Sequence, residues 1–120
     1  MKILNIDWLE VYCVEPLDTP LTADYFKEQG NDVEERKYGT PIYQEMFTIK
    51  RDGRPYIEVR RNPYSKASQG GIMLDNACHI RLSNETCYDE NPIEQLRLFL
   101  MAYNYRYMSI SRIDICLDFN

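Results

Sequence analysis

The residues with the clearest chemical potential lie in the last nine positions, from Arg112 to Asn120. Apolar and polar residues alternate strictly there, which is typical of a strand with one buried face. The polar face carries Arg112, Asp114 and Asp118. The two carboxylates lie roughly 13 Å apart along a strand, so neighbouring strands must supply further ligands before either could bind a metal ion. The same alternation is also typical of the solvent-exposed face of an ordinary antiparallel sheet. A ligand-binding face and a plain solvent-exposed face both stay open here.

Basic residues gather in the middle of the chain, although the whole chain has a net charge of −5. Residues 50–81 contain 7 basic and 3 acidic side chains, a local excess of +4. A local basic stripe matters more for phosphate binding than the total charge. Hairpins also carry Arg and Lys to protect their edges, and that alternative stays open. The candidate DNA-binding residues are Lys50, Arg51, Arg54, Arg60, Arg61, Lys66 and Arg81.

Length and composition predict one ordinary globular domain. The chain has 120 residues, of which 44% are hydrophobic and 28% charged, enough for a core without covalent cross-links. Neither a secretory leader nor a long apolar run is present, so we expect a cytoplasmic protein without a membrane partner. The four cysteines lack metal-binding spacing, and we expect them to be mostly reduced.

Segment patterns predict an α+β fold. We expect a mostly antiparallel sheet of about five to six strands, with a long helix and a short one packed on one face. The short helix has Thr22 as its N-cap and ends at Gly30. The expected strands are residues 3–15, 33–38, 42–51, 54–62, 78–84 and 112–120.

Two local signals sharpen this prediction. Asp52-Gly53 between alternating runs suits a two-residue type I′ turn. That turn would pair residues 42–51 with 54–62, with Ile49 opposite Tyr56. Asn91-Pro92 begins the long helix, with Asn91 as N-cap, and its apolar spacing continues to about position 106. This helix should pack against the apolar face of the final strand.

The ending Ser-Arg-Ile-Asp-Ile-Cys-Leu-Asp, residues 111–118, resembles the R-[IVL]-D-[IVL]-x-x-D strand of the replication initiation factor family. This family comprises the rolling-circle Rep proteins of plasmids, phages and conjugative elements. The opening Ile-Asp-Trp-Leu, the Tyr-rich hairpin, the Ile-Arg-Leu-Ser strand and the helix before the Asp-rich strand are similar in layout.

The resemblance implies a sequence-specific DNA nicking enzyme or relaxase. Such proteins use a divalent metal held by carboxylates and a tyrosine that becomes linked to a 5′ phosphate. When the family's motif is matched to this chain, the resemblance implies that Arg112 is a candidate catalytic residue. It also implies that Asp114 and Asp118 are candidate ligands for Mg²⁺ or Mn²⁺. Glu58 is the candidate third ligand, with Asp7 and His79 as alternatives. The implied partner is DNA at an origin or nick site, single-stranded or melted.

The family's nucleophilic tyrosine follows the Asp strand, where this chain stops. We therefore expect residues 1–120 to be one domain, the N-terminal part of a longer initiator, unable to nick DNA by itself. The alternative is a non-catalytic α+β module that binds nucleic acid or protein, with Tyr and Arg side chains forming a platform on its sheet.

Overall fold

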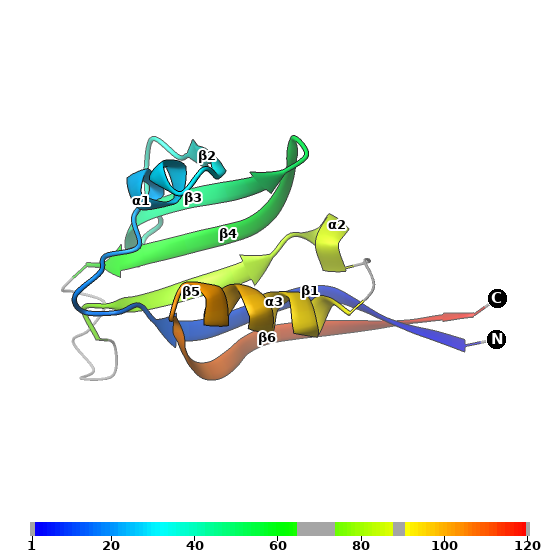
Figure 1. Cartoon of the computed structure of the whole chain (residues 1–120). Helices are drawn as coiled ribbons and strands as arrows, with labels where there is room; N and C mark the ends of the chain where they lie inside the picture. The colour runs from blue at the N-terminus through cyan, green and yellow to red at the C-terminus, as the bar shows by residue number, and fades with distance from the viewer. Residues whose placement is uncertain (1, 65–73, 88–90, 120) are drawn as a thin grey trace.

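One antiparallel sheet organises the chain (Figure 1). The computed structural model describes residues 2–64, 74–87 and 91–119, and the side chains of residues 5–64, 74–87 and 91–116. The strands lie in the order β2-β3-β4-β5-β1-β6, and each described pairing is antiparallel. The strands are β1 (Lys2–Val14), β2 (Asp32–Glu35), β3 (Tyr43–Arg51), β4 (Arg54–Pro63), β5 (Ala77–Leu82) and β6 (Arg106–Phe119). The helices are α1 (Ala23–Glu28), α2 (Asn84–Cys87) and α3 (Pro92–Ala102).

The prediction of a long helix packed on the sheet is wrong. The longest described helix, α3, has 11 residues and ends at Ala102. Asn104 then adopts a left-handed backbone with φ +60°, a conformation that ends helices. Tyr105 returns into the core, where its ring stacks on Phe99 at 5.9 Å between centroids. The described residues therefore form a mostly antiparallel sheet with three short helices, and not the α+β sandwich we expected.

The two predicted helix starts have different outcomes. Thr22 caps α1 as expected, because its Oγ1 accepts a hydrogen bond of 3.1 Å from the Tyr25 N–H. Gly30 follows this helix with φ +91°, as a helix stop requires. Pro92 occupies the first position of α3 as expected, but Asn91 has φ 58° and its side chain makes no capping hydrogen bond.

The hairpin turn and the first two strand pairs beside it, Arg51 with Arg54 and Lys50 with Pro55, are confirmed, and the predicted register beyond them is wrong. Asp52 and Gly53 have φ values of 53° and 76°, the positive values that a type I′ turn needs. Beyond the turn, however, Tyr56 bulges out of the register, so Ile49 pairs with Ile57. This one-residue shift turns Ile57 to the buried side of the sheet, whereas the predicted register would have placed charged Glu58 there.

The core lies between one face of the sheet and the three helices, and we call this face the helix side. Phe26 of α1 is fully buried and contacts Phe47 of β3 and Phe99 of α3, at 5.6 and 6.0 Å between ring centroids. Figure 1 shows α1 and α3 in front of the sheet. Apart from Phe47, the strands contribute mainly branched and small residues to this core. The four cysteines are free thiols. Burial of this apolar surface supplies the main driving force for folding.

A buried ion pair joins distant parts of the chain at one end of this core. Glu15, directly after β1, is only 4% exposed. Its carboxylate accepts hydrogen bonds from Arg61 Nε at 2.9 Å and from the Leu21 N–H at 2.5 Å. Arg61 Nη1 also donates to Glu45 on β3 at 2.5 Å. These contacts fix the loop that leads into α1 against β3 and β4.

We predict that Arg61→Met destabilises the protein strongly. Removing one partner leaves the buried Glu15 charge uncompensated, which costs about 3 kcal/mol or more of unfolding free energy. Lys27→Met is the matched control, because Lys27 forms an exposed ion pair with Glu35 and such pairs contribute at most about 1 kcal/mol. Urea denaturation measures both variants. Equal losses of stability would contradict the assigned role of the buried pair.

Candidate nucleic-acid interface

The sheet face opposite the helices carries a row of charged side chains of alternating sign. Glu58 pairs with Arg81, Arg81 with Glu10, and Glu10 with Arg112, across β4, β5, β1 and β6. Opposite charges on neighbouring strands stabilise such a row. All three helices place their buried residues on the other side. We call this surface the open face, and it comprises Trp8, Glu10, Tyr12, Glu58, Arg60, His79, Arg81, Arg112 and Asp114.

Two arginines on the open face stack on the chain's single tryptophan. The guanidinium carbon of Arg81 lies 3.3 Å from the centre of the Trp8 ring, and that of Arg112 lies 4.0 Å from it. Arg81 belongs to β5 and Arg112 to β6, the strands that flank β1 on either side. Arg81 is also held by Asn84, to whose Oδ1 it donates at 2.7 Å. The geometry is that of cation–π contacts and presents planar guanidinium groups on the sheet surface.

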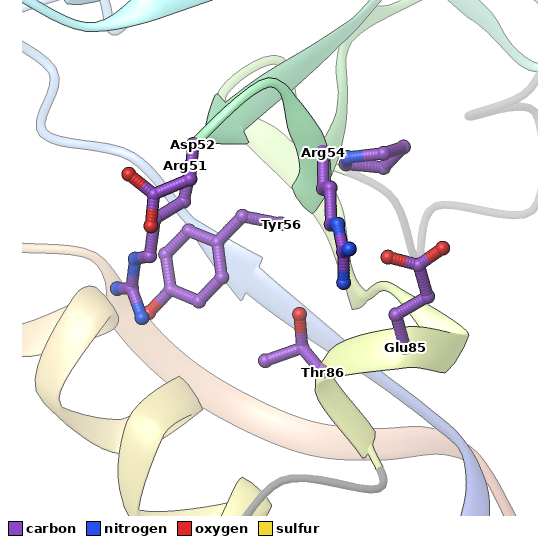
Figure 2. Close-up of a pocket in the computed structure, with 7 residues that line it drawn as sticks. Arg51, Asp52, Arg54, Tyr56, Glu85 and Thr86 are labelled. Atoms are coloured by element: carbon purple, nitrogen blue, oxygen red, sulfur yellow. The ribbon is translucent and has the colours of Figure 1, made fainter.

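A second arginine–aromatic stack lies at the tip of the hairpin. The Arg51 guanidinium carbon lies 3.6 Å from the centre of the Tyr56 ring. Figure 2 shows this pair on one side of a cavity and Arg54 on the other, with Glu85 near Arg54. The cavity has a volume of about 380 Å³. The bulge that spoils the predicted register therefore also supplies the aromatic wall of this cavity.

A second cavity, of about 300 Å³, shares two lining residues with the cavity at the hairpin tip. Both cavities are lined by Pro55 and Glu85, and the second is also lined by Glu58 and Arg81 of the open face. We call the two cavities together the arginine groove. The Arg51–Tyr56 stack lines the first cavity on the helix side, where the Tyr56 ring lies 6.5 Å from that of Phe99. Arg81, which covers Trp8 on the open face, lines the second cavity.

The seven predicted DNA-binding residues do not form one stripe. Arg51, Arg54 and Arg81 line the arginine groove. Lys50 and Arg60 are ion-paired with acidic neighbours at 3.0 Å each. Arg61 belongs to the buried ion pair, and Lys66 lies outside the described residues.

The candidate metal ligands do not converge among the described side chains. Glu58 lies on β4 and Asp114 on β6, with β5 and β1 between them, a separation of about 14 Å at the usual strand spacing. The Asp114 carboxylate accepts two hydrogen bonds from Arg112, at 2.7 and 3.2 Å, and this contact lowers the pKa of Asp114. The side chain of Asp118 lies outside the described ones. No group of three carboxylate, His or Cys side chains that could hold a metal occurs in the described part. Glu58 and Asp114 are therefore not placed to share one cation.

His79 takes part in an aromatic cluster instead. Its Nδ1 is hydrogen-bonded to the Tyr43 hydroxyl, and its ring lies 5.4 Å from that of Tyr12. Burial lowers the pKa of His79 below its ordinary value of 6.5; Glu10 opposes this shift and Arg60 adds to it. The neutral imidazole is therefore the favoured form near neutral pH.

We predict that His79 makes stability depend on pH. Its folded-state pKa is depressed, so its stabilising contribution is present above pH 6.5 and is lost as pH falls through the folded-state value. Urea denaturation between neutral and mildly acidic pH should show this loss in the wild type. His79→Gln, which removes the only histidine, should flatten the curve in that window. An unchanged pH profile in the variant would contradict the assignment.

Comparisons with family models, curated proteins and solved structures find no match for this chain. The family resemblance of the last strand therefore stays a prediction. Among the described helices, none is long and apolar enough to cross a bilayer. Trp8 is a candidate site residue that the sequence did not single out. In the sequence Trp8 is visible only as an aromatic residue on a predicted strand. The arginines that cover it come from β5 and β6, and only the register of these strands with β1 brings them there.

Proposed function

We propose that this chain is a single-stranded DNA-binding module of a rolling-circle type replication initiator, with the strand lying along the arginine groove and the open face. The observation that carries the proposal is the pair of arginine–aromatic stacks, Arg51 on Tyr56 and Arg81 with Arg112 on Trp8. Arg51 and Tyr56 line one cavity of the arginine groove, and Arg81 lines the other. Surfaces that bind single strands combine positive charge with planar groups on which bases stack.

Each part of the groove has a different task in this proposal. Arg112 has a half-exposed side chain, so its guanidinium plane can stack on a base while its other side rests on Trp8. Arg54 is exposed and has no ion pair among the described residues, which leaves its charge available for a phosphate. Tyr56 and Arg51 hold a second planar surface at the hairpin tip.

The charge balance favours single strands over duplex DNA. Acidic and basic residues are equal in number along the row from Glu58 to Arg112, so few counterions are released when this face binds. A duplex presents mainly phosphates and hides the flat faces of its bases. A single strand exposes those faces, and stacking contributes about 1–3 kcal/mol per base.

The initiator part of the proposal draws on the resemblance of the final strand. We assign to this chain the task of holding the DNA strand. No cleavage step is assigned to it, because Glu58 and Asp114 lie on strands too far apart to share one cation.

We predict that a fluorescent oligothymidylate binds the protein at low salt, measured by fluorescence anisotropy. Arg81→Ala should weaken binding about tenfold, because it removes one guanidinium plane from the platform, an effect of about 1.4 kcal/mol. Arg54→Ala should mainly reduce the salt dependence, lowering the slope of log K against log salt by about 0.7. Duplex DNA of the same length should bind more weakly than the single strand.

Arg36→Ala is the matched control, since Arg36 is an exposed arginine that does not line the groove. It removes the same charge and should leave the affinity within a factor of two or so. The absence of binding at low salt would contradict the proposal. If Arg36→Ala lowered the DNA affinity as much as Arg81→Ala, the interaction would be a nonspecific effect of charge. That result would also contradict the proposal.

A further inference from the structure

The two edges of the sheet differ in their protection. β2 forms one edge with only four residues, three of them the acidic Asp32, Glu34 and Glu35. β6 forms the other edge with 14 residues. Short, charged edge strands resist pairing with other chains, and long edge strands with apolar residues invite it. β6 is therefore the edge strand that is better suited to pair with a strand of another chain.

An apolar groove of about 350 Å³ runs beside this edge. Its walls include Leu96 and Leu100 of α3, and Tyr107, Ile110 and Ile113 of β6. The three β6 residues are 52%, 50% and 38% exposed. Contiguous exposed apolar surface of this kind marks an interaction site more often than a free surface.

We propose that β6 pairs antiparallel with β6 of a second copy, about a two-fold axis that passes at Ile113. A two-fold interface needs a surface that is complementary to itself, and the sequence of β6 meets this need. In this register Ile113 faces Ile113 of the second copy, and Arg112 of each chain lies opposite Asp114 of the other. Two opposite-charge pairs thus flank a central apolar pair, and this charge complementarity selects a second copy as the occupant of the edge.

The bulges of β6 are compatible with this register. Ser111 and Met108 have no partner in the register with β1, whereas the residues from Arg112 onward follow one another in that register. Bulges twist an edge and discourage pairing, so pairing is expected to centre on the segment after Ser111. In that segment Arg112 already contacts Asp114 of its own chain at 2.7 Å. The proposed dimer would add a contact between Arg112 of each chain and Asp114 of the other.

Charge reversal tests this pairing. Arg112→Asp puts two acids on each chain at the axis, and Asp114→Arg puts two bases there, so each variant alone should repel its own copies. Sedimentation equilibrium should show a dimer for the wild type and a dimer dissociation constant at least about tenfold higher for each variant. An equimolar mixture of the two variants should recover the dimer as a heterodimer, because acids then face bases.

Lys27→Glu is the control, as it reverses one charge of an exposed ion pair near the opposite edge, and it should dimerise like the wild type. A wild type that is monomeric across the accessible concentration range overturns the proposal and leaves the edge to another chain segment or partner. A mixture that stays as monomeric as its components also overturns it. DNA is absent from these measurements, so their outcome is independent of the proposed nucleic-acid binding.

Discussion

A buried carboxylate at the end of the first strand is the constraint on which the arrangement of the chain depends. Glu15 is surrounded by protein, so its charge requires partners. Arg61 supplies the countercharge from β4, and the Leu21 N–H supplies a further donor from the loop before α1. Satisfying this one group fixes how the loop crosses the sheet. That crossing places Phe26 over the core, where it contacts aromatic rings from β3 and α3.

Closing one face in this way leaves the other face free to carry polar groups. All three helices contribute to the helix side, and the opposite face is held instead by cross-strand charges of alternating sign. A row of this kind is stable without a covering layer, because each charge has an opposite neighbour. It also holds Arg81 and Arg112 over Trp8. The surface proposed to bind DNA is therefore a consequence of how the sheet satisfies its own charges.

Local signals in the sequence predict local structure well here, and long-range consequences less well. Asp52-Gly53 predicts the turn because only a few residue types tolerate its backbone. The bulge at Tyr56 follows from the burial of Ile57, which depends on strands far along the chain. Similarly, Arg54 and Arg61 are the same residue type in one predicted basic stripe, yet one is exposed and the other is buried beside Glu15. Tertiary partners decide that difference, and spacing does not reveal them.

Trp8 offers the most direct measurement of the central claim, because it is the only tryptophan and lies under the two arginines of the proposed platform. A titration of the protein with an oligothymidylate at low salt, followed by tryptophan emission, reports on that platform alone. We predict a saturable change in emission that follows the anisotropy of the labelled strand and that needs an about tenfold higher strand concentration in Arg81→Ala. Emission that stays constant while the strand binds would show that DNA contacts another surface and would contradict the account.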